Sequence, residues 1–268
     1  AARAAKDVMD LNQYFLFPDY QGLFLEVNER AADCEIMMRR CYTPKIDPSY
    51  LYYPLGEWPA FAPTKQLADS YYMNDGLPIS KSPKYDAQNP HMNRDPRFAA
   101  SLFYPGCQYL NFMIKAPDPE VSKDSIQIPS WLLNSTGYRS KKHFDGTLTN
   151  AEDEGRDTYF MRYAEILLNY AEALNESGAT KTDVLTWVDL IRERAGLKGV
   201  EESWDTYTND KKYETIDGRR EIIQQERGIE LSRRSAPRSL CGRRFQISRK
   251  DGKQLRSHHP GSTSFRQT

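Results

Sequence analysis

Apolar side chains recur at the roughly 3.6-residue period of an α-helix after position 158. The residues on this stripe are Phe160, Tyr163, Ala164, Leu167, Ala171 and Leu174. Asp157 is suited to cap the N-terminus of the helix, because its carboxylate can accept a hydrogen bond from the first turn. Gly178 is suited to end it, because glycine adopts the left-handed conformation that commonly follows a helix. The pattern predicts a helix over Tyr159–Asn175.

A second helix is predicted after a short turn. Thr180 and Asp183 have the spacing of a capping box at its start, and Gly196 is suited to end it. Its apolar stripe consists of Val184, Leu185, Val188 and Ile191. The two helices would form an antiparallel hairpin of the kind that builds tetratricopeptide repeats. Because one hairpin cannot bury its own stripe, we expect it to stack on helices in a part of the protein that precedes this chain.

Four regions are expected along the chain. Residues 1–42 have helical patterning and would end a helical-repeat region, whereas residues 43–157 are rich in prolines and turns and are the candidate ligand-binding region. Residues 158–232 would hold the hairpin and one further helix, and residues 233–268 form a basic tail. The predicted fold class is mainly α, with tetratricopeptide-like helical hairpins and a loop-rich region that bears short strands.

Shorter elements are predicted from local signals. Thr64 is suited to cap a short helix, and Gly76 follows that helix in a turn. The apolar runs Phe98–Tyr104 and Tyr109–Ile114 lie between turn signals and are predicted as strands. The last helix is expected at roughly Gly218–Ser232.

Composition narrows the class of protein. Aromatic residues make up 12% of the 268 residues, which argues against a disordered chain. No apolar run approaches about 18 residues, so no transmembrane helix is expected. The chain has neither an initiator methionine nor a signal peptide, and we expect it to begin inside a longer protein.

The cysteines lack the spacing of a zinc site and are expected to be buried thiols. They are Cys34, Cys41, Cys107 and Cys241.

Charge is distributed unevenly along the chain. Residues 233–268 carry ten basic residues and one acidic residue, a net charge of +9, which leaves −9 for residues 1–232. A break of this kind is typical of a nucleic-acid-binding tail or a foreign segment. Because the tail has few aromatic residues and no recognised fold, no nucleic-acid partner is expected.

Five motifs follow one another in a characteristic order. They are Pro63–Gly76 (PTKQLADSYYMNDG), Asn93–Arg97 (NRDPR), Arg162–Glu176 (RYAEILLNYAEALNE), Ile191–Leu197 (IRERAGL) and Glu226–Leu231 (ERGIEL). Taken together, they resemble the SusD/RagB family of glycan-binding outer-membrane lipoproteins. After Ser232 the chain departs from the family pattern, which suggests a reading-frame slip there and a disordered tail.

The resemblance implies a function. It implies a non-enzymatic protein at the cell surface of the outer membrane, held by a lipid anchor that this fragment lacks. The whole protein would bind an oligosaccharide or polysaccharide and deliver it to a SusC-like TonB-dependent transporter. No cofactor is implied, and the binding of a structural calcium ion is left as an open alternative. The alternatives are a helical-repeat scaffold that binds only proteins and a glycoside hydrolase.

Aromatic side chains in a proline-stiffened loop are the candidate glycan contacts. They are Tyr50, Tyr52, Tyr53, Trp58 and Phe61. Aromatic faces suit sugar rings, whose C–H groups stack on π systems. The alternative is that these side chains fill the core of a loop-rich region, and Trp58 is the first candidate for binding.

Two carboxylate pairs have to be considered for glycoside hydrolysis. Asp69 with Asp75, or Glu165 with Glu172, would be the candidates, but abundant solvated acids explain them better. No catalytic or metal site is therefore predicted. Asn93–Arg97 is expected to be a structural turn whose arginines pair with local carbonyl groups.

Overall fold

The computed structural model describes residues 1–41, 63–109, 112–113, 136–143 and 157–232, all within one compact unit. The helices described are α1 (Ala2–Asp10), α2 (Lys65–Ser70), α3 (Pro96–Ser101), α4 (Tyr163–Glu176), α5 (Lys181–Arg194), α6 (Val200–Tyr207) and α7 (Ile216–Glu230). Short 3-10 turns lie at Gly22–Phe24, Glu26–Asn28, Ala31–Cys34 and Lys212–Glu214.

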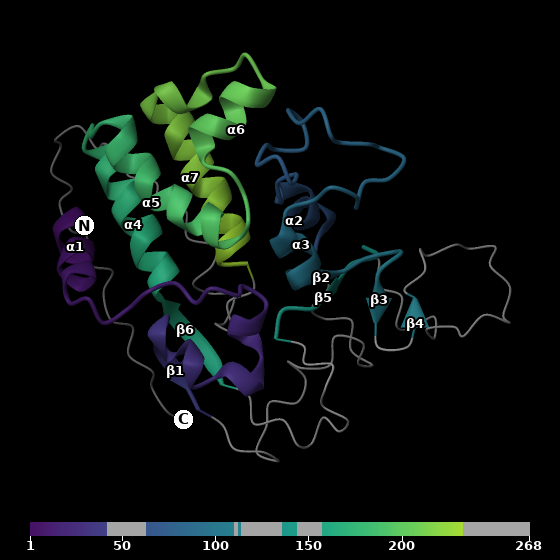
Figure 1. The fold of residues 1–268 in the computed structure, drawn as a ribbon, viewed down its shortest axis with the longest axis horizontal. Coiled ribbons are helices and arrows are strands. Elements are labelled where there is room, and N and C mark those ends of the chain that lie inside the picture. The colour runs from purple at the N-terminus through teal and green to yellow at the C-terminus, as the bar shows by residue number, and fades with distance from the viewer. Residues whose placement is uncertain (42–62, 110–111, 114–135, 144–156, 233–268) are drawn as a thin grey trace, which may run out of the picture. The chain divides into compact units, whose positions relative to one another are not determined.

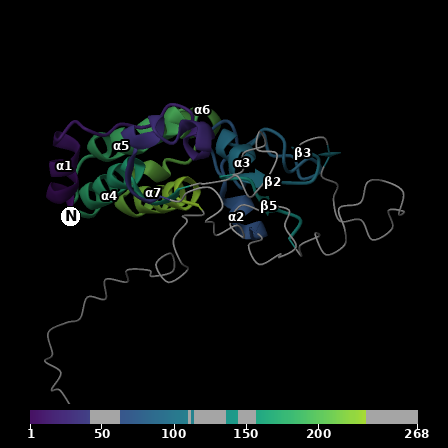
Figure 2. The ribbon, with the colours of Figure 1, turned by 90° about the horizontal axis from the view of Figure 1, so that it is seen from below.

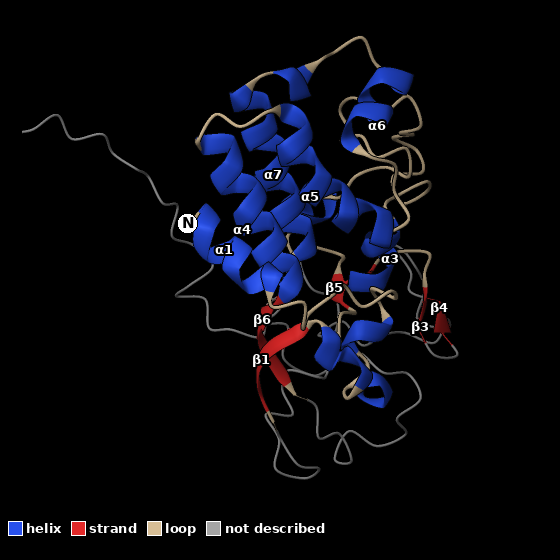
Figure 3. Ribbon diagram, turned by 60° about the vertical axis from the view of Figure 1, so that its left-hand side comes forward, coloured by secondary structure: helices blue, strands red, loops and turns tan. Residues whose placement is uncertain are grey.

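The strands of the described part are short and pair two by two. They are β1 (Ile36–Arg40), β2 (Leu102–Phe103), β3 (Gln108–Tyr109), β4 (Phe112–Met113), β5 (Arg139–Ser140) and β6 (Thr158–Arg162). Antiparallel pairs form between β1 and β6, β2 and β5, and β3 and β4. Helices contain far more of the described residues than strands do (Figure 1, Figure 3), so the mainly α fold class is confirmed.

The predicted helical hairpin is present as α4 and α5. Thr180 caps α5, because its side chain accepts a hydrogen bond from the backbone amide of Asp183 at 3.2 Å. Gly178 and Gly196 follow the two helices with φ values of +80° and +78°, in the left-handed region that favours glycine. The facing side chains Leu167, Ala171, Val184, Leu185, Val188 and Ile191 are buried.

Helices of this same chain cover the hairpin. α1 packs against α4, and α7 packs against both α4 and α5 (Figure 2). Ala5 and Met9 of α1 join the core that contains Ala164, Leu167 and Ile191. The expectation that the stacking partners precede this chain is therefore wrong for these faces, because α1 and α7 supply the covering side chains.

Strands occupy two stretches that were predicted to be helical. β1 lies within residues 1–42 and pairs with β6, which places Ile36 opposite Arg162. α4 begins only after β6, so its N-cap is Arg162 and not Asp157. The helical predictions fail here because local apolar patterning does not report a pairing between two segments that are distant in sequence.

Capping chemistry also decides the structure around α2 and α3. The Thr64 side chain accepts a hydrogen bond from the Leu67 amide at 3.1 Å, as predicted for an N-cap. The strand predicted at Phe98–Tyr104 is wrong in its first half, because α3 occupies it. Asp95 caps α3 through the Arg97 amide at 2.9 Å, and proline at the first helical position needs no N–H partner.

The second predicted strand, Tyr109–Ile114, is divided between β3 and β4. These two strands pair with each other, with Gln108 opposite Met113. The apolar run therefore turns back on itself as a small hairpin.

Two further expectations can be compared with the described residues. Cys34 and Cys107 are half-buried, but Cys41 is exposed just beyond the end of β1, so the prediction of buried thiols is wrong for Cys41. Cys241 lies outside the described residues.

In the described part of the chain, none of the helices combines the length and the apolar character needed to cross a bilayer.

Replacing Gly76 and Gly228 with alanine should change the free energy of unfolding in opposite directions. Gly76 has a φ of +83°, and a Cβ there would collide with Arg192 Nη2 and Ser203 Oγ. We expect Gly76→Ala to lower the free energy of unfolding by about 1–3 kcal/mol. Gly228 is exposed inside α7, and a Cβ added to it would meet no atom within 4 Å, so Gly228→Ala should raise the free energy of unfolding by about 0.5–1 kcal/mol. Urea denaturation measures both, and equal effects would contradict the conformational argument.

Candidate functional site

The aromatic residues predicted to contact a glycan lie outside the described residues. This holds for all of them, Tyr50, Tyr52, Tyr53, Trp58 and Phe61. Their role therefore stays a prediction. The described chain resumes at Pro63 and Thr64, which lead directly into α2. The surroundings of α2 and α3 are thus the described residues nearest in sequence to the predicted site.

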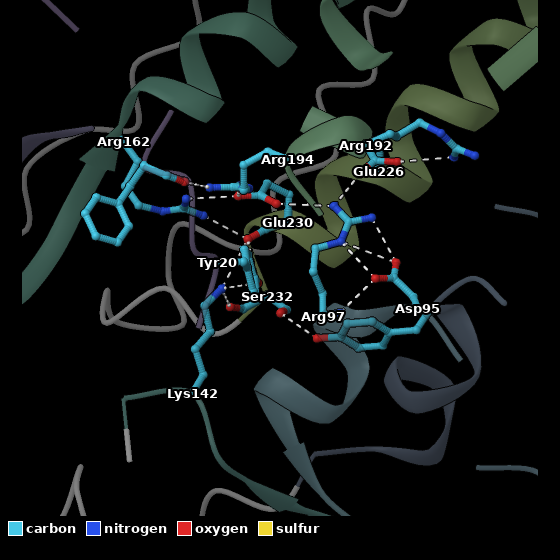
Figure 4. A network of polar contacts seen from close by, with 12 residues as sticks. Tyr20, Asp95, Arg97, Lys142, Arg162, Arg192, Arg194, Glu226, Glu230 and Ser232 are labelled. Carbon is cyan, nitrogen blue, oxygen red and sulfur yellow. Dashed lines mark hydrogen bonds and ion pairs between the residues drawn. The ribbon is translucent and has the colours of Figure 1, made fainter. Parts of the chain in front are cut away.

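A buried network of charges joins the C-terminal end of α7 to α3, α5 and β6 (Figure 4). Its cations are Arg97, Arg162, Arg192 and Arg194, and its carboxylates are Glu35, Asp95, Glu226 and Glu230. The side chains of this network are at most 7% exposed. Because four cations face four carboxylates, the charges compensate one another.

Glu230 lies at the centre of the network. Its Oε1 is 2.9 Å from Arg162 Nη1 and 2.5 Å from Arg194 Nη2, and its Oε2 is 3.2 Å from Arg97 Nη1. Glu35 bridges two of the same arginines from the other side, at 2.6 Å to Arg162 and 3.1 Å to Arg194. One carboxylate of α7 thus ties together β6, α5 and α3.

The pKa of Glu230 shows that attraction to the neighbouring arginines outweighs the effect of burial on its carboxylate. Burial alone would raise this pKa, but the guanidinium groups of Arg194, Arg162 and Arg97 hold it well below its ordinary value of 4.5. Glu230 is therefore ionised at neutral pH. The network is a charged one, and it stabilises the fold as long as all its partners are present.

Lys142 lies beside the network and pairs with neutral oxygen atoms. Its Nζ donates to Tyr20 Oη at 2.8 Å and to the carbonyl oxygens of Ser232 at 3.0 Å and Glu230 at 3.1 Å. Burial, followed by the charge of Arg162, lowers the pKa of Lys142 well below its ordinary value. The network and Lys142 together fasten the last turn of α7 and present no charge to a ligand.

Three of the four carboxylates considered for hydrolysis contact neighbouring side chains or a backbone amide. Asp69 pairs with Lys65 at 2.5 Å, and Asp75 accepts hydrogen bonds from the Leu77 amide at 3.0 Å and from Ser82 Oγ at 2.5 Å. Glu172 lies 3.7 Å from Arg227. Within the residues that the structure describes, no group of three or more His, Cys, Asp or Glu side chains could hold a metal ion.

The Asn93–Arg97 segment makes structural contacts, and the predicted pairing with local carbonyl groups is confirmed for Arg94 but wrong for Arg97, which pairs with the carboxylates of Asp95, Glu226 and Glu230. Arg94 donates hydrogen bonds to the carbonyl oxygens of Ala68 at 2.6 Å, Tyr71 at 3.0 Å and Pro90 at 3.0 Å. These bonds hold the loop before α3 against the end of α2. The same loop thereby fixes the position of the residues that precede it, including His91.

Four rings gather beside this loop, and we call them the aromatic group: His91, Phe98, Tyr104 and Tyr138. The His91 ring centroid is 4.9 Å from that of Tyr104, and the Tyr104 centroid is 5.0 Å from that of Phe98. His91 Nε2 is 3.1 Å from Tyr138 Oη. Phe98 is fully buried, whereas His91 and Tyr104 are half-buried. Rings from four separate positions thus form a single cluster that reaches the surface.

The sequence did not indicate the aromatic group. Tyr138 joins it from the segment before β5, far along the chain from His91. The nearest local signal is the turn at Pro105 and Gly106, which brings Tyr104 to the end of β2. No spacing rule links these positions.

Three comparisons place the chain among known proteins. The model of the SusD family matches residues 26–233. A SusD-like carbohydrate binding protein from Bacteroides fragilis NCTC 9343 is 26% identical, with a TM-score of 0.63 over 86% of this chain and 45% of its own. A second SusD-like protein of that strain is 23% identical, with a TM-score of 0.62 over 86% of this chain and 47% of its own. The chain therefore spans less than half the length of these two structures, and no curated protein matches it significantly.

Proposed function

This chain belongs to the SusD family, and from that premise we propose that it is part of a cell-surface protein that binds oligosaccharide or polysaccharide without cleaving it. The observation that carries the proposal is the similarity, in sequence and in fold, to the carbohydrate binding protein of B. fragilis. The helices α4, α5 and α7, where three of the five family motifs lie, form the core of the described fold. The loop-rich residues 43–157 are proposed to supply the glycan contacts.

The finer part of the proposal concerns the partner and the place. We propose that the whole protein is lipid-anchored in the outer membrane and hands its glycan to a SusC-like TonB-dependent transporter. Co-purification of the protein with such a transporter from detergent-solubilised outer membranes would support this partner. Recovery of the protein in the soluble fraction, with no transporter attached, would contradict it.

The binding function is tested against its alternatives by one pair of assays. The purified protein is run on native gels that contain soluble polysaccharides, and the same mixtures are assayed for new reducing ends. Retardation without new reducing ends supports a binding protein. Release of reducing ends would identify a hydrolase instead, and neither effect with any polysaccharide would favour a scaffold that binds only proteins.

Trp58→Ala is expected to weaken glycan binding by about 1–3 kcal/mol, because the indole would supply a desolvated face for a sugar ring. Isothermal titration calorimetry measures the change. Trp187→Phe is the matched control: Trp187 is half-buried on α5, 5.3 Å from the ring of Tyr170. Unchanged affinity of the Trp58 variant, together with a loss of stability, would place Trp58 in the core.

A further inference from the structure

We infer that the aromatic group of His91, Phe98, Tyr104 and Tyr138 is a carbohydrate subsite that takes the ring face of a neutral sugar. The inference rests on the proposed glycan-binding function and adds to it a place and a class of sugar. None of the four residues belongs to a family motif or to the aromatic residues of the 50–61 loop, although Phe98 directly follows the motif Asn93–Arg97. Three features of the group support it: the rigidity of its rings, the hydroxyl group of Tyr104 at its edge and the balance of charges around it.

The rings are held in place before any ligand arrives. His91 Nε2 bonds to Tyr138 Oη, and the backbone of Pro105 lies close enough to affect the pKa of His91. Burial lowers the pKa of His91, so the ring is neutral at pH 7 and can donate through one nitrogen while it accepts through the other. Phe98 supports the group from below, with the Arg94 guanidinium 4.6 Å from its centroid. A rigid aromatic surface loses little conformational entropy when it binds.

Among the residues that the structure describes, the hydroxyl group of Tyr104 is left to bind at the edge of the rings. Tyr104 is half-buried, and its Oη has no hydrogen-bond partner among the described residues. Tyr85 is also half-buried, and it lies close enough to affect the pKa of Tyr138. A sugar needs an aromatic face with polar groups beside it, because its C–H face packs on a ring while its hydroxyl groups require donors and acceptors.

The charges near the group favour a neutral sugar over an acidic one. The cations whose charges affect the pKa of His91 are Lys65 and Arg94. Lys65 is paired with Asp69 at 2.5 Å, and Arg94 donates to backbone carbonyl groups. Neither cation is therefore available as a partner for a uronic acid or a sulfate ester, which would need an unpaired cation.

The test uses the full chain and native gels that contain a β-glucan, a xylan, a galactomannan or soluble starch, with polygalacturonate as the anionic counterpart. Tyr104→Ala removes the ring and should weaken binding to the preferred neutral polysaccharide about tenfold. Tyr104→Phe keeps the ring but removes the hydroxyl group, and should weaken binding only a few-fold. Tyr14→Ala is the matched control, because Tyr14 is half-buried elsewhere, with its ring 6.3 Å from that of Tyr163.

The outcomes separate this inference from the proposed function. If the wild-type protein binds none of the polysaccharides, both are wrong. If it binds one, and the Tyr104→Ala and Tyr104→Phe variants bind it as tightly, the glycan-binding function stands and the subsite is overturned. Binding of polygalacturonate alone would overturn the neutral-sugar class. Circular dichroism melting of each variant shows whether a loss of binding reflects a loss of fold, and Tyr104→Phe keeps the test decisive if the alanine variant unfolds.

Discussion

Replacing Glu230 with alanine is expected to lower the free energy of unfolding by about 3–5 kcal/mol, the range found when one partner of a buried ion pair is removed. Arg162, Arg194 and Arg97 would each lose a carboxylate oxygen within 3.2 Å. They would stay buried, because the helices and strands that carry them pack around the same place. The loss therefore exceeds that of an exposed pair, where water replaces the partner.

Glu172→Ala is the matched control for this variant. Glu172 is also a glutamate within a long helix of this chain and lies near an arginine, but its side chain is 42% exposed and 3.7 Å from Arg227. Its removal should change the free energy of unfolding by less than about 1 kcal/mol. Urea denaturation of the two variants gives the comparison, and similar losses in both would show that the buried network contributes nothing specific.

The same carboxylate makes stability depend on acid. Because its pKa in the folded protein lies below the ordinary 4.5, Glu230 contributes stability that is fully present above that value. The contribution is lost progressively as the pH falls below 4.5 towards the folded-state pKa. Unfolding midpoints measured from neutral to acidic pH should therefore fall more steeply for the wild-type protein than for a Glu230→Gln variant, which has no carboxylate to protonate there.

Leu167→Asp is expected to cost about 4 kcal/mol or more, because it leaves a cavity and also places a carboxylate in an apolar core. Leu167 is 1% exposed and packs in the core shared by α1, α4 and α5. Its location differs from that of the charge network, since its surroundings are aliphatic and aromatic. Thermal and urea unfolding would both show the loss.

Leu190→Asp serves as its control on the partner helix of the hairpin. Leu190 is 39% exposed, so aspartate there stays in contact with water and should cost no more than about 1 kcal/mol. An unchanged melting temperature of Leu167→Asp would contradict the packing of the hairpin itself. A large loss in both variants would instead show that any aspartate in this hairpin is harmful.

Local signals were sufficient to predict the hairpin and several caps. Each of these signals involves only a few neighbouring residues: the 3.6-residue stripe of α4, the Thr180 cap and the glycines after each helix. All of them are present in the structure. α6 was missed because its cap is not local. Asp189, on α5, accepts a hydrogen bond from the Val200 amide at 2.8 Å and so supplies the start of α6 from another helix.

The candidate sites were harder to predict for the same reason. The carboxylate of Glu226 and the guanidinium of Arg97 belong to motifs that the sequence singled out, yet nothing local shows that they meet. The aromatic group likewise depends on Tyr138 reaching His91 from a distant segment. Sequence reasoning could place aromatic residues in a stiff loop around Trp58, because that proposal needs only neighbouring residues.

The buried network also has a consequence for the order in which the protein can fold during its synthesis. Arg97 lies 129 residues before Glu226 and 133 before Glu230, and Glu35 lies 127 residues before Arg162. Since the ribosome releases the N-terminal part first, Arg97 emerges long before the carboxylates of α7, and Glu35 emerges long before Arg162. Until these partners arrive, the core around them cannot close without burying unpaired charge. α7 is thus the helix that completes the described fold. A chain that ends before α7 would leave the ribosome with exposed cations and an open apolar core.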